Sequence, residues 1–346
     1  MTNCWLPYYH AEIQTNGSVR PCCKYTAEWI DSIADYTNKN RQDFLENDLP
    51  DACLPCKVSD DIWSYRTMRT AHFSKFWPAP TSPKLKSLNL SIDNICSNSC
   101  LQCSASNSST IAYLHGQKES YSWNLDMLDD YLPDLEFLTV SGGEPLQSYR
   151  FVALCEKISR LCKNLKIITV PTSCYKLHMR NITALANLNV PVVCRISING
   201  PWPLNAYIRG CDEKVWLDNL ELLKRYKFRL CWQVTIGSYN VFALPETVSY
   251  LDSLLGTRHI TPSPVIFPET HSVKQMADNL KIATRKKLLS FMPNPSSRDL
   301  IRTAIDLLDQ PRTLEWQNCI SSIESIPKLR TSPYNLAQFI SHYLTD

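Results

Sequence analysis

The sequence predicts an α/β fold, and two observations support this class. Across the middle of the chain, short apolar or alternating stretches are followed by segments whose apolar residues recur at helical spacing. Strands that alternate with helical stretches of about 10–15 residues are typical of βαβ units and a parallel sheet. Hydrophobic residues make up 44% of the 346 residues and charged residues 20%, so the chain can bury a large core.

Six strands are expected in this middle region. Leu85–Ile92 alternates between apolar and polar residues, and Leu135–Val140 is a short apolar run. The other strands are expected at 165–170, 190–198, 229–236 and 260–267, and the helices at 151–161, 178–188, 213–226 and 243–255. Six such units are too few to close an eight-stranded barrel, which leaves a partial barrel or an open sheet.

Prolines divide the chain into three segments. A proline-rich stretch at 78–83 cannot sustain a helix, and it ends an N-terminal segment, 1–83, that is rich in aromatic residues and cysteine. The strand-and-helix region follows over 84–268. The last segment, 269–346, has helical spacing between prolines. Its helices are expected at 269–292 (with an interruption), 298–309, 313–325 and 333–344.

The composition argues against several classes of protein. A net charge of +3 gives no basic footprint of a nucleic-acid-binding protein. No apolar run approaches the ~20 residues of a membrane span, and the first residues lack the regions of a signal peptide. We therefore expect a cytoplasmic protein with no membrane partner. Thiols stay reduced there, so clustered cysteines indicate metal binding or catalysis rather than disulfides.

Three of the 15 cysteines form a C-x3-C-x2-C motif directly after the first expected strand. They are Cys96, Cys100 and Cys103. Three thiolates this close can hold one face of a [4Fe–4S] cluster, and without a fourth cysteine nearby one iron keeps an open position for a substrate or cofactor. A zinc site with a distant fourth ligand, or three core cysteines, also fits this spacing taken alone.

A second motif follows the second expected strand. Gly142 and Gly143 stand side by side, although the chain has only eight glycines, and they let the backbone bend sharply and approach a ligand. Together with the cysteine motif, this segment resembles the radical S-adenosylmethionine (SAM) enzymes. The resemblance implies a partial (βα)6 TIM-type barrel and a [4Fe–4S] cluster chelated by SAM. It also implies that the SAM methionine amino group is lined by Gly142, Gly143, Glu144 and Pro145.

Further residues are carried over by the same resemblance. The segment 196–201, ISINGP, is similar to the family's S-I-D-G-P after strand four, with Asn199 in place of Asp. This implies that Ser197 and Asn199 contact the SAM ribose or methionine. Arg209 lies in a Tyr-Ile-Arg-Gly segment whose Arg pairs with the SAM carboxylate in the family, a task that suits a bidentate guanidinium. A surface arginine is the alternative. The resemblance also places Asn240 near the adenosine.

The N-terminal segment carries a second set of cysteines. The candidate ligands are Cys4, Cys22, Cys53 and Cys56, with Cys23 as an alternative to Cys22. Asn16 and Gly17 predict a hairpin that would bring the first two ligands together. Four thiolates on a hairpin and a loop fit a zinc ribbon or an all-cysteine iron–sulfur cluster. The pattern resembles the SPASM/twitch module, here placed before the barrel, and this implies a second, auxiliary [4Fe–4S] cluster.

The resemblance implies an enzyme. In this family the reduced cluster cleaves SAM to methionine and a 5′-deoxyadenosyl radical, which abstracts hydrogen from the substrate. It also implies an external electron donor of the flavodoxin or ferredoxin type. The substrate is unidentified, with a peptide slightly favoured over a sugar, nucleoside or other small molecule. The alternative is a non-catalytic zinc-ribbon-type binding protein on a degenerate barrel.

Overall fold

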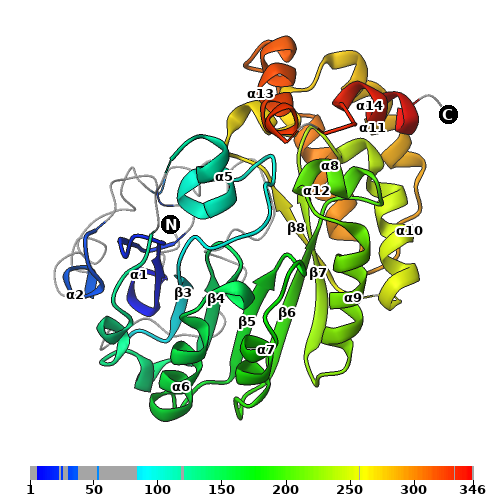
Figure 1. The fold of residues 1–346 in the computed structure, drawn as a ribbon. Coiled ribbons are helices and arrows are strands. Elements are labelled where there is room, and N and C mark those ends of the chain that lie inside the picture. The colour runs from blue at the N-terminus through cyan, green and yellow to red at the C-terminus, as the bar shows by residue number, and fades with distance from the viewer. Residues whose placement is uncertain are drawn as a thin grey trace. The chain divides into compact units, whose positions relative to one another are not determined.

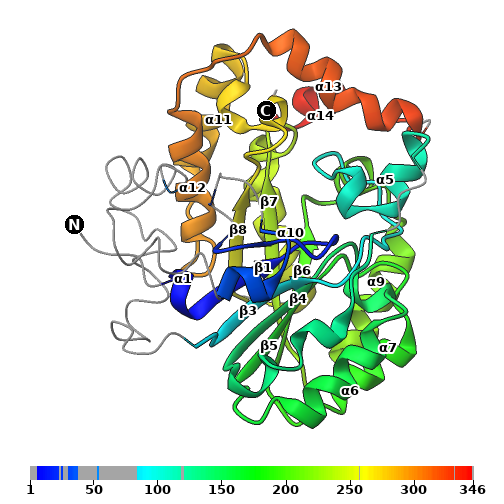
Figure 2. The same cartoon turned by 90° about the vertical axis from the view of Figure 1, so that its left-hand side faces the viewer.

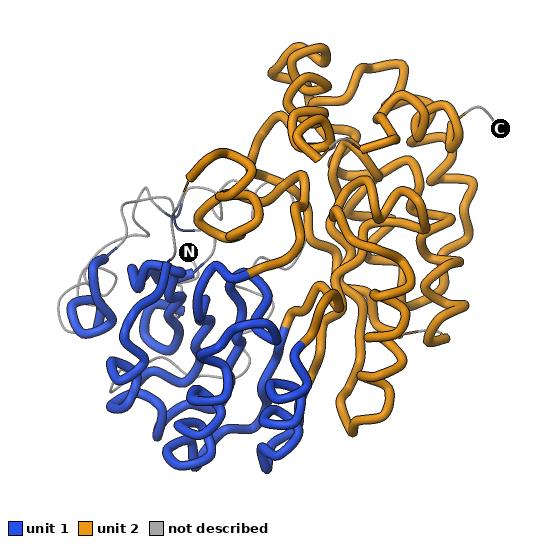
Figure 3. Tube along the Cα trace, viewed as in Figure 1, with its two compact units in different colours: residues 1–95, 120–170, 178–192 blue, residues 96–119, 171–177, 193–346 orange. Residues whose placement is uncertain are grey.

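The structure, a computed structural model, describes residues 6–22, 25, 30–37, 53, 84–117, 121–256, 258–330 and 332–344. The chain splits into two compact units, which Figure 3 shows in different colours. The first unit comprises residues 1–95, 120–170 and 178–192, and the second comprises 96–119, 171–177 and 193–346. The strand-and-helix region therefore contributes to both units, and the C-terminal helical segment belongs to the second.

The first unit is built on strands in the order β2-β1-β3-β4-β5. Their bounds are β1 His10–Ile13, β2 Val19–Arg20, β3 Ser87–Ser91, β4 Phe137–Ser141 and β5 Ile167–Thr172, of which the last two residues fall in the second unit. The pair β1–β2 is antiparallel, and β1–β3, β3–β4 and β4–β5 are parallel. Alternate side chains such as Leu88, Leu90 and Val140 are fully buried, as the period of a strand requires.

Two longer helices accompany these strands. The helices of the first unit are α1 Leu6–Tyr9, α2 Ile33–Asp35, α6 Phe151–Leu161 and α7 Met179–Ala186, with 3-10 turns η5 Leu125–Leu128, η6 Leu132–Asp134 and η7 Pro145–Gln147. Helices α6 and α7 contact each other (Figure 1). Helix α6 buries Phe151, Leu154, Cys155 and Ile158, a stripe at i, i+3, i+4 and i+7 that explains why this segment is an amphipathic helix.

The predicted Asn16–Gly17 hairpin is confirmed. The Gly17 N–H donates to the Gln14 carbonyl over 2.9 Å, in the turn that joins β1 to β2. Strand β1 is also the parallel neighbour of β3, with Ala11 opposite Leu88. The start of the N-terminal segment is thus part of the same sheet as the first strand of the strand-and-helix region, a pairing that local sequence pattern does not reveal.

The buried His10 predicts a pH-dependent stability. Its Nδ1 lies 2.9 Å from Ser87 Oγ, and burial lowers the pKa of His10 from 6.5 to about 4. As the pH falls, the unfolded chain therefore binds a proton at His10 before the folded chain does. The free energy of unfolding keeps its full His10 contribution above pH 6.5 and falls by about 2 kcal/mol at pH 5. Urea unfolding at pH 7 and pH 5 should show this loss in the wild type and a smaller loss in His10→Gln. An equal loss in both proteins would contradict the assignment.

The second unit is built on parallel strands in the order β6-β7-β8. Their bounds are β6 Val192–Ile198, whose first residue falls in the first unit, β7 Arg229–Ile236 and β8 Ile260–Pro264. The helices are α5 Ser109–Leu114, α8 Leu204–Arg209, α9 Glu213–Lys224, α10 Leu244–Leu255, α11 Asp278–Ser290, α12 Arg298–Leu308, α13 Trp316–Leu329 and α14 Leu336–Leu344. The 3-10 turns are η4 Ala105–Asn107, η8 Val241–Ala243, η9 Glu269–His271 and η10 Val273–Gln275. Helix α12 contacts β8 (Figure 2).

The predicted α/β class and the helical C-terminal end are confirmed. Each of the six expected strands is present, as β3 to β8. The interruption expected in 269–292 takes the form of the two turns η9 and η10, which precede α11. Strand β8 ends earlier than expected, at Pro264, because prolines within and beyond it leave few N–H donors for a ladder. Within the described residues, no helix is long and apolar enough to cross a bilayer.

Candidate cysteine-loop site

The three-cysteine motif forms a loop that is held against the end of α8. The Ser99 N–H donates to the Arg209 carbonyl over 3.1 Å, and the Leu101 N–H donates to the Ile208 carbonyl over 3.0 Å. These carbonyls belong to the last turn of α8, where no intrahelical donor is left for them. The helix end and the loop therefore satisfy each other's backbone groups, and the loop between Cys96 and Cys103 has a defined conformation.

The start of the loop is fixed by the first turn of α5. The Cys96 N–H donates to Ser109 Oγ over 3.1 Å, and the Cys96 carbonyl accepts from Thr110 Oγ1 over 2.7 Å. Ser108 caps α5 and donates its hydroxyl to the Asn98 carbonyl over 2.9 Å. Three consecutive hydroxyl side chains thus organise the loop, and the run of Ser and Thr after the cysteine motif has a structural explanation.

The three thiols differ in exposure. Cys100 is buried, and Cys96 and Cys103 are partly exposed. The Asn98 N–H donates to Cys96 Sγ over 3.4 Å. In iron–sulfur proteins, hydrogen bonds to the ligand sulfurs help to set the reduction potential of the cluster. Although the residue is partly exposed, desolvation of its sulfur raises the pKa of the Cys103 thiol. The neighbouring Cys100 acts in the same direction, and the charge of Arg209 opposes both. A raised pKa favours the protonated thiol of Cys103. A bound metal would instead stabilise the thiolate, because the thiolate is the form that coordinates metal.

The described residues bear on two kinds of ligand set, that of a single metal ion and that of a cluster. In the described part of the chain, no three His, Cys, Asp or Glu side chains are close enough together to hold one metal ion. A cubane cluster binds each thiolate at a different iron, so its ligands lie farther apart than the ligands of one zinc ion. Three thiols on one loop are a donor set of the kind that iron–sulfur clusters take, so Cys96, Cys100 and Cys103 remain the candidate ligands.

A buried polar network lies in the same unit at the ends of β6 and β7. Arg209 Nη1 donates to Asn199 Oδ1 over 2.8 Å, and Asn240 Nδ2 donates to the Asn199 carbonyl over 2.7 Å. Asn199 and Asn240 are 0% exposed and Arg209 is 6% exposed, so Arg209 is not a surface arginine. The fold thus brings together three residues that the sequence analysis singled out. Ser197 lies within β6 opposite Gln233 and is half-buried.

The Gly142–Pro145 segment belongs to the first unit. The Gly143 N–H donates to the Asp93 carbonyl over 2.9 Å, and the Glu144 N–H donates to the Ile95 carbonyl over 2.6 Å. A Cβ at either glycine would lie closer than 3.0 Å to this backbone, and Gly142 has a φ of +132°. The close approach that glycine permits here is to the backbone of residues 93–95. The Glu144 carboxylate is buried and accepts from the Leu146 N–H at the start of η7, whose first residue is Pro145.

A buried carboxylate beside this segment was not predicted from the sequence. Asp93 accepts from Ser148 Oγ over 2.5 Å and from the Ile95 N–H over 3.0 Å. Burial raises the pKa of Asp93, while these two donors and the charge of Arg150 act against the shift. Arg150 itself donates to the Ile92 carbonyl over 2.6 Å and to the Trp123 carbonyl. These contacts fix the turn after β4, and no motif marks them because their partners are distant in the sequence.

The N-terminal cysteine set is described only in part. Cys22 is buried and Cys53 is partly exposed. Cys4, Cys56 and the alternative ligand Cys23 lie outside the described residues. The auxiliary site therefore stays a prediction.

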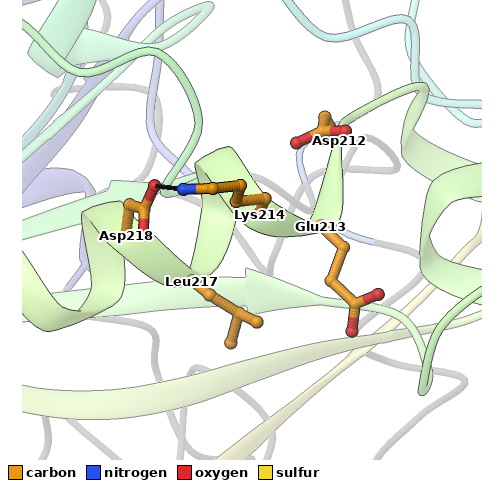
Figure 4. A pocket seen from close by; sticks show the side chains of 5 residues that line it. All are labelled: Asp212, Glu213, Lys214, Leu217 and Asp218. Atoms are coloured by element: carbon orange, nitrogen blue, oxygen red, sulfur yellow. Dashed lines mark hydrogen bonds and ion pairs between the residues drawn. The ribbon is translucent and has the colours of Figure 1, made fainter.

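The surface of the described residues has two hollows whose lining residues are known. One, of about 560 Å³, is at the start of α9 and is lined by Asp212, Glu213, Lys214, Leu217 and Asp218 (Figure 4). In it Lys214 Nζ lies 2.8 Å from Asp218 Oδ2, an exposed pair that contributes little to stability. The other, of about 500 Å³, lies in the first unit between α6 and α7. None of the predicted site residues lines either hollow.

Comparison with known proteins gives partial structural matches. No protein-family model and no curated protein sequence matches the chain. Native anSMEcpe with bound AdoMet and Cp18Cys peptide aligns with a TM-score of 0.47 and 17% identity over 64% of this chain and 62% of that chain. Streptococcus suis SuiB bound to precursor peptide SuiA aligns with a TM-score of 0.43 and 12% identity over 92% of this chain and 63% of that chain.

A third solved structure is a radical S-adenosylmethionine methyltransferase, TsrM from Kitasatospora setae, with cobalamin and a [4Fe-4S] cluster bound. It aligns with a TM-score of 0.36 and 13% identity over 52% of this chain and 36% of that chain. The chain spans 52% to 62% of the length of the anSMEcpe structures with bound peptide.

Proposed function

We propose that this chain is a radical SAM enzyme that binds a [4Fe–4S] cluster through Cys96, Cys100 and Cys103. The observation that carries the proposal is the cysteine loop itself. Its thiols lie on a loop whose backbone is fixed at both ends, and a buried guanidinium stands beside it. Cys96 and Cys103 are partly exposed, whereas three coincidental core cysteines would be buried as small apolar side chains.

The chain's own residues would bind and orient the cofactor. When bound and reduced, the cluster supplies the electron that cleaves SAM to methionine and a 5′-deoxyadenosyl radical. Arg209 is proposed to pair with the SAM carboxylate, and its bond to Asn199 fixes the orientation of the guanidinium. Asn199 and Ser197 are proposed to contact the ribose or methionine. The Gly142–Pro145 segment is proposed to bind the methionine amino group.

The substrate and partners follow from the same proposal. We propose a peptide or small molecule as substrate, and a flavodoxin or ferredoxin as electron donor. Cys4, Cys22, Cys53 and Cys56 are proposed to hold an auxiliary [4Fe–4S] cluster.

Metal analysis of anaerobically purified protein tests the proposal against a zinc protein. We expect about eight iron and eight labile sulfide per chain if both clusters are present, and about four of each if only the cysteine-loop cluster assembles. Zinc in the absence of sulfide would overturn the proposal and favour the zinc-ribbon alternative.

A further inference from the structure

Arg330, at the end of α13, is tied to the cysteine loop. Its Nη1 donates to the Ser99 carbonyl over 3.3 Å and to Ser99 Oγ over 3.2 Å. Its Nη2 donates to the Tyr207 carbonyl in α8. Ser99 stands between Cys96 and Cys100, so one guanidinium connects the C-terminal helices, the cysteine loop and α8. In Figure 2 the end of α13 reaches the segment that carries α5.

The contact depends on a glycine beside it. Gly210 follows α8 with a φ of +63°, and a Cβ there would lie closer than 3.0 Å to both Ser99 Oγ and Arg330 Nη1. Any larger residue would push the loop and the guanidinium apart. Arg330, Ser99 and Gly210 therefore form one packed arrangement, although Arg330 lies 231 residues from Ser99 in the sequence.

The charge of Arg330 is also placed to act on the cysteines. Burial lowers the pKa of Arg330, and its interactions with Cys100, Tyr207 and Cys211 act in the opposite direction. A guanidinium stays charged even when it is partly desolvated, and it presents several donors in one plane. It can therefore hold a loop and supply a fixed positive charge at the same time.

We infer that Arg330 is a positioning residue for the cysteine loop, which it clamps at Ser99 while it holds a positive charge beside Cys100. The inference rests on the proposed function, because it gives the loop a cluster to hold. Two consequences follow. Loss of the clamp loosens residues 96–103 even without a cluster. Loss of the charge makes the reduced cluster less favourable, so its reduction potential becomes more negative.

The first test uses hydrogen–deuterium exchange of the full, iron-free chain. In Arg330→Gln we expect peptides covering 96–103 to exchange about tenfold faster. The Ser99 carbonyl and hydroxyl lose their donor, so the loop can move away from the α8 carbonyls that hold the Ser99 and Leu101 amides. Peptides from α9 serve as the internal reference and should not change. Unchanged exchange over 96–103 would overturn the inference, whether or not the protein binds iron.

Glu324→Ala is the matched control. Glu324 docks the same C-terminal helices, because its Oε1 accepts from Tyr207 Oη over 3.0 Å and from the Leu336 N–H over 2.5 Å. We expect this variant to speed exchange in α14 and to leave 96–103 within about twofold of the wild type. If it loosens 96–103 as much as Arg330→Gln, general docking of the helices explains the effect and the clamp at Ser99 is wrong.

The second test separates charge from structure in cluster-loaded protein. An EPR-monitored redox titration should give a more negative midpoint potential for Arg330→Gln than for the wild type. Arg330→Lys keeps the charge with fewer donors, so its potential should stay close to the wild-type value. Equal potentials in all three proteins, or equal shifts in both variants, would overturn the electrostatic role. Protein that takes up no cluster contradicts the proposed function and leaves the exchange result to decide on the clamp.

Discussion

Cys100→Ala is expected to abolish formation of 5′-deoxyadenosine from SAM and to remove about four iron per chain. Cys100 is the buried member of the cysteine loop, and alanine has no ligand atom with which to replace its thiolate. The remaining two thiolates leave two irons of a cubane without a protein ligand. Anaerobic reconstitution, iron and sulfide analysis and chromatography of the nucleoside products provide the measurement.

Cys231→Ser is the control for this prediction. The Cys231 thiol donates to the Cys194 carbonyl over 3.8 Å within the β6–β7 pair, outside the cysteine loop, and serine is a small polar replacement for it. This variant should keep its iron and its activity. Wild-type iron content and turnover in Cys100→Ala would show that the loop does not hold the cluster.

Gly143→Ala is expected to destabilise the first unit by about 3 kcal/mol. The added Cβ would meet the backbone of Asn94 and Ile95 at less than 3.0 Å, and these atoms cannot rotate away as a side chain can. The same shift would lengthen the bonds that hold Gly143 and Glu144 to residues 93–95. Urea unfolding followed by circular dichroism measures the free energy of unfolding.

Ser141→Ala is the comparison on the same segment. It removes a hydroxyl that donates to the Leu90 carbonyl over 3.2 Å, and we expect a loss of about 1 kcal/mol without a steric clash. A Gly143→Ala protein as stable as Ser141→Ala would mean that the backbone at 93–95 does not constrain this glycine.

Much of the fold could be predicted because its signals are local. The alternation in β3, the apolar runs in β4 and β5 and the stripe of α6 each lie within a dozen residues. The Asn16–Gly17 turn is equally local, since its φ and its bond to Gln14 depend on neighbouring residues. The pairing of β1 with β3 was missed because it joins distant residues, and no short pattern specifies a partner strand.

In the candidate site, too, features with local sequence signals could be predicted and features that depend on distant residues could not. The cysteine spacing together with the Gly142–Pro145 segment predicts the cluster ligands, and these signals are local in the sequence. The family resemblance indicated Asn199, Arg209 and Asn240, which the fold brings into one network. The family resemblance did not indicate Arg330, whose partner Ser99 lies 231 residues away in the sequence. It also did not indicate Tyr239, whose hydroxyl donates to Gln102 Oε1 in the cysteine loop over 3.1 Å. Both residues act through tertiary contact with the loop and carry no chemical signature of their own.

Formation of 5′-deoxyadenosine tests the central proposal most directly. Anaerobically reconstituted wild-type protein is incubated with SAM and dithionite, and the nucleoside and methionine are quantified. We predict that both products form in equal amounts, and only when the reductant is present. An intact iron–sulfur cluster that yields no 5′-deoxyadenosine above the control without reductant would contradict the account.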